Sequence, residues 1–344
     1  MRKLILLLSW WLLAPSALLG QPTLPVSPSM RRPVTLKAPA LKEGDTIGLA
    51  APASPLDRAR IEAAATRLRE RGYKVRIGTA ATERLGFLAG SDADRVRDLH
   101  TLFLDPTVRA IVCVRGGYGS PRLLDLLDMD LIRKHPKILV GYSDITALHL
   151  ALQRETGLVV FHGPMAKEWS APRGLSPFAE SHYWEAFQPQ SRRFARWGVG
   201  VAKPRKLVAG VADGRLVGGN LSVICALMGT RYEIDTRDAI LFLEDVGEKL
   251  FRIDRMLNQL RLAGKLAQAK GILFGRFAAC EDRDGQITLD EVFKDYCGNL
   301  GVPVLADFPA GHVADHATLP LGVQVRLDAT AGNLSILEAP VTPR

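Results

Sequence analysis

Apolar residues divide the first half of the chain into short buried runs and longer amphipathic stretches. The continuous apolar runs predict strands at residues 46–51, 74–77, 110–114, 138–140 and 158–161. Apolar residues at helical spacing predict helices that open at Ser54-Pro55 and after Ser91, and further helices over residues 122–127 and 145–154. Because strand and helix alternate, we predict an α/β fold with a doubly wound parallel sheet, which binds ligands at the carboxyl ends of its strands.

A second region of mixed strands and helices begins near Val208. Asp213-Gly214 predicts a hairpin turn, and Gly218-Gly219-Asn220 predicts the start of a helix that runs to Met228. The remaining pattern predicts strands at 239–243, 271–277 and 304–306, helices at 250–262 and 289–300, and a closing hairpin of 323–327 with 334–337. We therefore expect a smaller α/β or β-rich second domain.

The N-terminal segment has the form of a secretory signal. Arg2 and Lys3 precede an apolar run over residues 4–19, which is too short and too often interrupted to span a membrane. The proline-rich residues after it predict an extended tether. The predicted order is a signal at 1–20, a tether at 21–44, a first domain at 45–165, an inter-domain connection at 166–206 and a second domain at 207–338. A periplasmic protein follows, with an uncleaved N-terminal anchor in the inner membrane or a cytoplasmic location as the alternatives.

The composition is that of a folded protein with a large core. The chain has 344 residues, 47% of them hydrophobic and 24% charged, which suits two domains. Its net charge is +9, but the basic residues are scattered without aromatic residues among them, so we predict no nucleic-acid partner. Four widely separated cysteines without a C-x-x-C spacing predict buried thiols rather than a zinc site or a disulfide framework.

The stretch KILVGYSDITALHLAL at residues 137–152 places a serine between a buried strand and an amphipathic helix. A serine on such a turn is lifted off the carboxyl edge of the sheet, as in a nucleophile elbow. Ser143 also suits a helix N-cap and Asp144 the first helical turn, so a cap without chemistry explains the same residues. The usual elbow has a glycine two residues after the serine, where this chain has Ile145. A nucleophile and a helix cap both remain open.

A glycine-rich turn, residues 115–119, follows the third predicted strand. It has neither the G-x-G-x-x-G spacing nor the lysine of a phosphate loop, so a nucleotide site is not predicted. The strands before this turn and before the serine should be neighbours, so that Gly117 and Asp144 can supply the two N–H groups of an oxyanion hole. Arg115 then lies near enough to bind a substrate carboxylate, and Tyr142 is a candidate substrate contact.

Two titratable residues stand at strand ends in the second region. Glu244 closes the apolar run ILFLE, where a buried charge needs a partner or a function. An ion pair with Arg252 or Arg255 would explain it without catalysis. His312 lies on a glycine-containing loop, which suits a general base and equally an ordinary loop histidine.

A metal site is the remaining interpretation of the histidines. His312, Asp315 and His316 are spaced as ligands on one helical face. Neither an H-E-x-x-H motif nor a cysteine cluster accompanies them. We therefore predict no metal and no cofactor.

Seven ordered motifs resemble those of the LD-carboxypeptidases, serine peptidases also called muramoyltetrapeptide carboxypeptidases, which have the microcin-C immunity peptidases as relatives. The motifs are RGGYG at 115–119, GYSDIT at 141–146, HGPM at 162–165, GGNL at 218–221, LEDVGE at 243–248, FRIDRML at 251–257 and AGH at 310–312. The resemblance extends from about Asp45 to Leu337. The chain departs from the family pattern at Lys249-Leu250, at Ser120-Pro121 and in its N-terminal signal.

The resemblance implies a Ser-Glu-His triad, which falls on Ser143, Glu244 and His312. It implies a flavodoxin-like, class I glutamine amidotransferase-like first domain that carries the nucleophile elbow, and a smaller swivelling β/α second domain that carries the other two residues. The implied activity is hydrolysis of the L,D-amide bond between meso-diaminopimelate and the terminal D-alanine of murein tetrapeptides, in peptidoglycan recycling or turnover, by a homodimer. A related hydrolase of peptidyl-nucleotide toxins and a periplasmic binding protein without chemistry are the alternatives.

Overall fold

A computed structural model describes residues 32–190, 192–194, 201–280, 285 and 287–344. The predicted signal and the first part of the predicted tether lie outside these residues. Residues 33–344 form one compact unit, in which two sheets with their helices make a two-domain α/β fold. Within the described residues, no helix is long and apolar enough to cross a membrane.

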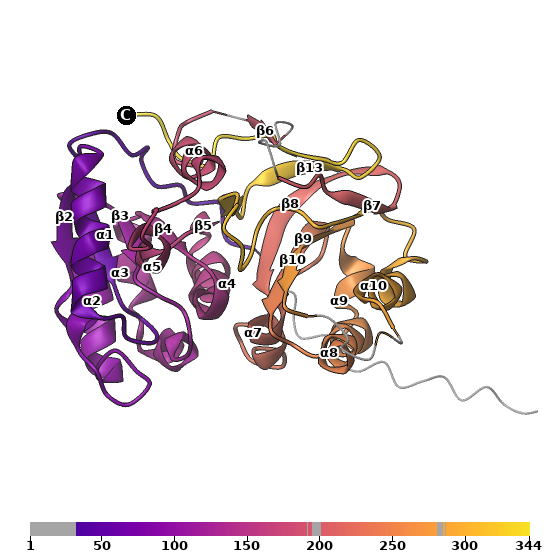
Figure 1. Ribbon diagram of the computed structural model, residues 1–344, viewed down its shortest axis with the longest axis horizontal. Coiled ribbons are helices and arrows are strands. Elements are labelled where there is room, and N and C mark those ends of the chain that lie inside the picture. Colours follow the sequence, from indigo (N-terminus) through magenta and orange to yellow (C-terminus); the bar gives the residue numbers. More distant parts are fainter. Residues whose placement is uncertain (1–31, 191, 195–200, 281–284, 286) are drawn as a thin grey trace, which may run out of the picture. The chain divides into compact units, whose positions relative to one another are not determined.

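The first sheet has six strands in the order β12-β5-β4-β3-β1-β2, and all but β12 run parallel. Its strands β2, β3, β4 and β5 are labelled in Figure 1. The strands are β1 (Thr46–Ala50), β2 (Lys74–Ile77), β3 (Val108–Cys113), β4 (Ile138–Gly141), β5 (Val160–His162) and β12 (Leu319–Leu321). The strand order reverses between β1 and β3. In doubly wound sheets, ligands bind at the carboxyl ends of the strands near this reversal. Here the loops after β1 and β3 are joined, because the N–H of Ser54 donates to the carbonyl of Gly116 at 3.2 Å.

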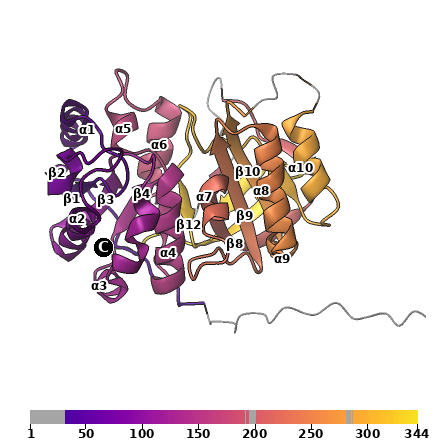
Figure 2. The same ribbon diagram turned by 90° about the horizontal axis from the view of Figure 1, so that it is seen from below.

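Helices cover both faces of this sheet, as Figure 2 shows. One face carries α1 (Arg58–Glu70), α5 (Ala166–Trp169) and α6 (Pro177–Glu185), and the other carries α2 (Asp92–Leu104), α3 (Met129–Lys134) and α4 (Thr146–Thr156). Ser91 caps α2 as predicted, because its hydroxyl accepts a hydrogen bond from the N–H of Asp94. The helix expected over residues 122–127 is instead a 3₁₀ helix, η2 (Ser120–Leu126), and two further 3₁₀ turns are η1 (Thr79–Thr82) and η3 (Ser143–Ile145).

The second sheet has eight strands in the order β6-β14-β13-β8-β9-β10-β11-β7, in which β8 to β11 are parallel. Its strands are β6 (Arg192–Phe194), β7 (Arg205–Val208), β8 (Val211–Asn220), β9 (Ala239–Val246), β10 (Gly271–Ala278), β11 (Val304–Ala306), β13 (Gln324–Asp328) and β14 (Asn333–Ile336). The helices α7 (Leu221–Ala226), α8 (Leu250–Leu262), α9 (Lys265–Gln268) and α10 (Leu289–Cys297) lie on one face of it in both views (Figures 1 and 2). The predicted closing hairpin is confirmed, since Leu327 pairs with Leu334.

The predicted turn at Asp213-Gly214 is wrong, because β8 continues through both residues. A Cβ added to Gly214 would lie 2.8 Å from the carbonyl oxygen of Asp238, just before β9. The glycine thus permits a close approach of two strands, which is the other common use of glycine in a sheet.

The two sheets share chain segments. β12 comes from the C-terminal half but forms the edge of the first sheet, where Leu319 pairs with His162 and Leu321 with Val160. Leu36, which we expected in the tether, forms a bridge with Leu158. Ala38, Ala40 and Leu41 are buried, so this stretch packs against the domain instead of hanging free.

The predicted connection also packs against the first sheet. The side chains of Arg71 and Glu180 form an ion pair at 2.5 Å, and the rings of Tyr73 and Trp184 stack with their centroids 4.9 Å apart. These contacts fasten α6 beside α1. The four cysteines are free thiols, three of them buried, as the sequence predicted.

Candidate active site

Ser143 lies at the junction of β4 and α4, on the carboxyl edge of the first sheet. Its φ is +63°, in the left-handed region that non-glycine residues rarely adopt, and it is partly exposed. Backbone strain of this kind gathers at functional sites. A Cβ added to Gly141 would lie 2.7 Å from Cγ2 of Ile145. The close packing that the turn needs is therefore provided by a glycine two residues before the serine.

The glycine turn after β3 packs against this serine. A Cβ added to Gly116 would lie 3.0 Å from Cβ and 3.2 Å from Oγ of Ser143. Ser54 holds the turn from the other side, since its hydroxyl accepts the N–H of Tyr118 at 3.1 Å and its own N–H donates to the Gly116 carbonyl at 3.2 Å. Gly117, the predicted oxyanion donor, has a φ of +99° and faces Ser54. Gly116 is thus the glycine of the turn that touches the serine side chain.

Asp144 ties the serine turn to the glycine turn. Its carboxylate accepts the N–H of Ser120 at 2.8 Å, and its carbonyl accepts the Ser120 hydroxyl at 2.5 Å. Burial raises the pKa of the Asp144 carboxyl. These bonds fix the backbone of the residue that we predicted as the second oxyanion donor.

The two predicted substrate contacts have different surroundings. Arg115 is exposed, and its guanidinium donates to the carbonyl of Pro55 at 3.4 Å, so it remains accessible to an anionic group. Tyr142 is 4% exposed, and its hydroxyl donates to Oε1 of Glu168 at 2.9 Å. This enclosed position does not fit a substrate contact at Tyr142, because both the ring and the hydroxyl are engaged inside the protein.

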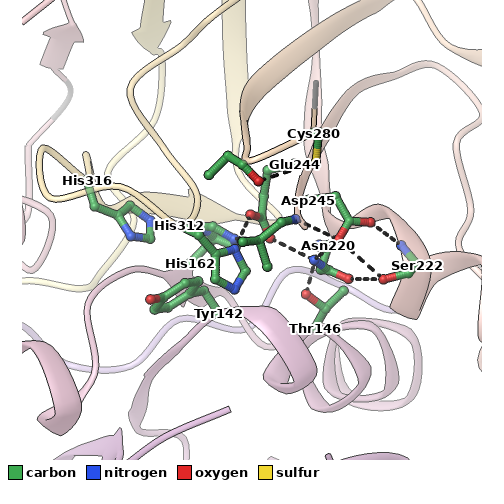
Figure 3. Close-up of polar contacts among 12 residues, drawn as sticks. Tyr142, Thr146, His162, Asn220, Ser222, Glu244, Asp245, Cys280, His312 and His316 are labelled. Carbon is green, nitrogen blue, oxygen red and sulfur yellow. Dashed lines mark hydrogen bonds and ion pairs between the residues drawn. The ribbon is translucent and has the colours of Figure 1, made fainter. Parts of the chain in front are cut away.

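Glu244 and His312 form a buried carboxylate–imidazole pair (Figure 3). Nδ1 of His312 lies 2.8 Å from Oε2 of Glu244, which is 0% exposed, whereas the His312 side chain is 16% exposed. A Cβ added to Gly311, whose φ is +123°, would lie 2.8 Å from the same oxygen, so this loop requires glycine. Arg252, the alternative partner for the carboxylate, pairs with Glu248 instead.

The pair has a defined protonation state. Burial alone would raise the pKa of Glu244, but the contacts with His162 and His312 outweigh burial and lower the pKa to about 2. A carboxylate can only accept hydrogen bonds, so Nδ1 of His312 carries the proton and Nε2 is the basic nitrogen. The arrangement can therefore accept a proton at Nε2 and stabilise the resulting imidazolium.

Asn220 joins the two sheets at this point. Its side-chain amide donates to Oδ1 of Asp245 at 3.0 Å and to Oε1 of Glu244 at 3.3 Å, and its backbone N–H donates to Oγ1 of Thr146 at 3.0 Å (Figure 3). Thr146 is the first residue of α4, three residues after Ser143. Neither Asn220 nor Thr146 was predicted from the sequence as a site residue, although the motifs GGNL and GYSDIT contain them.

Two further histidines were missed as parts of this site. His162, in the HGPM motif, is fully buried, and His316 is 1% exposed. Nδ1 of His162 lies 3.1 Å from Nε2 of His316, while Nε2 of His162 lies 3.7 Å from Oε1 of Glu244. The signal that could have identified His162 is its position directly after the predicted strand 158–161, beside the strand that leads to the serine.

The structure separates the three residues considered as metal ligands. His312 contacts Glu244, His316 contacts His162, and Asp315 accepts the hydroxyl of Ser176 at 2.6 Å. No group of three or more histidine, cysteine, aspartate and glutamate side chains among the described residues is arranged to hold a metal ion.

Tyr142 connects the turn that carries Ser143 to the loop that carries His312. Its ring lies edge-on to His312 with the centroids 4.9 Å apart, and it directly precedes Ser143. Among the described residues, no hydrogen bond joins the Ser143 hydroxyl to His312 in this structure. The serine, the glycine turn and the Glu244–His312 pair are nevertheless gathered at one end of the first sheet, which is an arrangement suited to acyl transfer.

Comparison with known proteins gives consistent matches over most of the chain. Residues 47–163 match a family model described as the LD-carboxypeptidase N-terminal domain, and residues 213–327 match the LD-carboxypeptidase C-terminal domain. A probable murein peptide carboxypeptidase of Bacillus subtilis is 42% identical over 308 residues, which cover 89% of this chain and 95% of that protein. The microcin C7 self-immunity protein MccF of Escherichia coli is 28% identical over 334 residues, which cover 88% of this chain and 96% of that protein.

A solved structure agrees with these matches. The muramoyltetrapeptide carboxypeptidase from Oxalobacter formigenes superposes with a TM-score of 0.77 and 31% identity, covering 86% of this chain and 100% of that chain. Two family models, a relative above 40% identity and a shared fold lead to the same conclusion. The chain belongs to the LD-carboxypeptidase family, the S66 family of peptidases.

Proposed function

We propose that this chain is a serine carboxypeptidase that hydrolyses the L,D-amide bond between meso-diaminopimelate and the terminal D-alanine of murein tetrapeptides. The observation that carries the proposal is the buried Glu244–His312 pair, 2.8 Å between Oε2 and Nδ1, beside the turn that holds Ser143 at φ +63°. The names of relatives as murein peptide and muramoyltetrapeptide carboxypeptidases support the substrate class.

In the proposed mechanism, Ser143 attacks the diaminopimelate carbonyl while His312 removes the hydroxyl proton at Nε2. Glu244 keeps the imidazole in its tautomer and balances the positive charge that forms. His312 then gives the proton to the leaving nitrogen, so D-alanine departs and an ester to Ser143 remains. His312 then removes a proton from water, which attacks the ester carbonyl. His312 returns this proton to Oγ of Ser143 as the bond to the serine breaks and the trimmed peptide leaves.

Charges that develop during this reaction have candidate partners at the rim of the site. The backbone N–H groups of Gly117 and Asp144 are the proposed oxyanion donors, each of them worth about 3 kcal/mol of barrier. The exposed guanidinium of Arg115 is the proposed partner of the terminal carboxylate of the substrate. The serine comes from one sheet and the other two triad members from the second, so the reaction needs both sheets in register.

A peptidyl-nucleotide is the alternative substrate. The similarity to MccF over 88% of this chain supports it, because the same triad can cleave any accessible amide carbonyl that the pocket admits. The two substrates differ in the group beyond the scissile bond, a single D-alanine in one case and a nucleotide in the other. Only turnover of both compounds side by side separates these two functions.

The deciding experiment is mass spectrometry of a disaccharide-tetrapeptide incubated with the wild type and with Ser143→Ala. We expect the wild type to release one alanine and Ser143→Ala to leave the substrate intact. A peptidyl-nucleotide is incubated in parallel. If wild type trims neither compound, or the serine variant trims as fast as wild type, the proposed function is refuted.

A second measurement tests the alternative of a binding protein without chemistry. A serine-directed phosphonate should label the wild type at Ser143, and His312→Ala should slow the labelling strongly, because the serine then lacks its base. Absence of labelling in both proteins would favour the binding protein.

Location and assembly are also proposals. We propose a periplasmic enzyme released by removal of the N-terminal signal, where murein fragments are present, and a homodimer by resemblance to the family. Fractionation of cells and light scattering of the purified protein test the two points.

A further inference from the structure

Glu244 faces a second imidazole on its other oxygen. His162, the last residue of β5, is fully buried with Nε2 3.7 Å from Oε1 of Glu244, and this nitrogen has no hydrogen-bond partner among the described residues. Its ring is held by edge contacts with Phe242, at 4.9 Å between centroids, and with Tyr142, at 5.7 Å. A buried ring clamped in this way presents a fixed edge to the carboxylate.

His316 contacts the nitrogen of His162 that faces away from Glu244; both histidines are labelled in Figure 3. Its Nε2 lies 3.1 Å from Nδ1 of His162, and its ring packs at right angles to Tyr142 with the centroids 4.9 Å apart. Burial, followed by the neighbouring His162, lowers the pKa of His316 well below 6.5. His316 is therefore a neutral ring with a single N–H.

For a neutral His162, these distances favour one tautomer of each ring. If His162 carried its proton on Nδ1, the lone pair of Nε2 would face the anionic Glu244 where both side chains are fully buried, which is repulsive. With the proton on Nε2, the N–H dipole points toward the carboxylate and Nδ1 accepts the N–H of His316. The resulting order of donors is His316 Nε2–H to His162 Nδ1, then His162 Nε2–H toward Oε1 of Glu244.

The order of donors has a consequence for the opposite oxygen. Oε1 of Glu244 faces His162 and accepts the amide of Asn220 at 3.3 Å, so Oε2 is the oxygen left for His312. We propose that His162, backed by His316, is a positioning residue that holds Glu244 in the one orientation that serves His312. The inference rests on the proposed serine-peptidase function and adds two residues to its machinery.

The test compares two substitutions at position 162. His162→Gln places an amide N–H near the position of Nε2, whereas His162→Phe keeps a ring of similar size and removes both nitrogens. We expect kcat for disaccharide-tetrapeptide to fall about tenfold or more in His162→Phe with KM nearly unchanged, as for loss of one donor to a charged carboxylate. His162→Gln should keep most of kcat.

A readout without substrate accompanies the kinetics. In ¹⁵N-histidine-labelled protein, the N–H of His312 bonded to Glu244 gives a low-field proton resonance. It should be present in the wild type and His162→Gln, and displaced or broadened in His162→Phe. If His162→Phe fails to fold by circular dichroism, the pair His316→Gln and His316→Phe takes its place with the same expected order.

The two proposals fail in different ways. An active wild type with equal kcat in the Phe and Gln variants, or an unchanged resonance in His162→Phe, overturns the positioning role. A wild type that cleaves no substrate, with the resonance displaced only in the Phe variant, refutes the proposed function and leaves the positioning role supported.

Discussion

Glu244 is a charged side chain that the fold encloses completely. An ionised carboxylate without partners in such a place would cost several kcal/mol, and the usual response is protonation. Here the Nδ1–H of His312 and the amide of Asn220 donate to its two oxygens, and the imidazole of His162 faces one of them. The charge is therefore kept, and with it the ability to stabilise an imidazolium.

The lowered pKa of Glu244 predicts acid sensitivity. Its folded value of about 2 lies below the value of 4.5 for an unperturbed glutamate, so the unfolded chain takes up the proton first as pH falls. The stabilisation is complete above about pH 4.5 and is lost as pH falls toward 2. The gap in unfolding free energy between wild type and Glu244→Gln should therefore narrow between about pH 5 and about pH 2, by up to about 3 kcal/mol.

Urea titrations across this pH range measure the gap. Glu62→Gln, at a half-exposed position on α1 with a weak contact at 3.9 Å to Arg69, is the matched control and should keep the wild-type pH curve. A gap between wild type and Glu244→Gln that stays constant with pH would contradict the prediction.

The sequence identified those candidate site residues that can be recognised from the residues next to them in the chain. Ser143 between strand and helix, Glu244 at the end of an apolar run and His312 after a glycine each stand out from their neighbours in sequence. Choosing these three together needed the resemblance to a family, because nothing local links Glu244 to His312, which follows it by 68 positions, or to the still earlier Ser143. Gly116 and His162 were not assigned their contacts, because those contacts depend on how loops from different strands meet.

Among elements, α4 and β8 are joined by a buried hydrogen bond. The N–H of Asn220, at the end of β8, donates to the hydroxyl of Thr146, at the start of α4. An added Cβ on Gly219 would lie 2.6 Å from the same hydroxyl oxygen. The helix that follows the serine is thus held directly against the strand that leads to Asn220.

Two threonine-to-valine changes test this bond. Thr146→Val keeps the shape but leaves the Asn220 N–H buried without an acceptor, so unfolding free energy should fall by about 1–3 kcal/mol. Thr318 is equally buried, but its hydroxyl has no hydrogen-bond partner among the described residues. Thr318→Val should therefore be neutral or stabilising. Chemical denaturation of both variants checks the contrast, and equal destabilisation would argue against it.

The prediction of helices and strands succeeded where the hydrophobic periodicity was clear. It failed at Gly214, because glycine occurs both in tight turns and where two strands approach closely. β11 and α8 have the predicted bounds, because continuous burial and a 3.6-residue period leave few alternatives. Asp213-Gly214 has the composition of a tight turn, yet the glycine accommodates β9. That distinction depends on a neighbouring strand about 25 residues away and is not contained in local sequence.

At the scale of the whole molecule, the two sheets form one unit. β12 lies in the first sheet although the chain reaches it from the second, and the loop that carries His312 makes this crossing between β11 and β12. Leu36, near the start of the described chain, forms a bridge with Leu158, just before β5 of the first sheet. The sequence predicted two domains that follow each other along the chain. It did not predict that β12 joins the first sheet, because a three-residue strand does not indicate which sheet it pairs with.

Unfolding should therefore be a single cooperative event. Trp169 and Trp184 lie with the first sheet. In a Trp197→Phe protein that begins at Gln21, and so lacks every tryptophan outside the described residues, fluorescence therefore reports on that half, whereas far-ultraviolet circular dichroism reports on both. For this protein, the two signals should give the same midpoint in urea. Two separated midpoints would mean that the halves unfold independently.

The position of β12 in the first sheet also limits how the two halves of the gene can recombine with those of a related gene. A recombination between two related genes in the connection at residues 166–206 would join five strands of one parent's first sheet to the edge strand β12 from the other parent. It would also import the histidine loop with a packing surface that evolved against a different β5. The two halves are therefore expected to be inherited together as one gene. A viable chimera would need to take residues 319–321 and residues 160–162 from the same parent, because these two strands pair with each other.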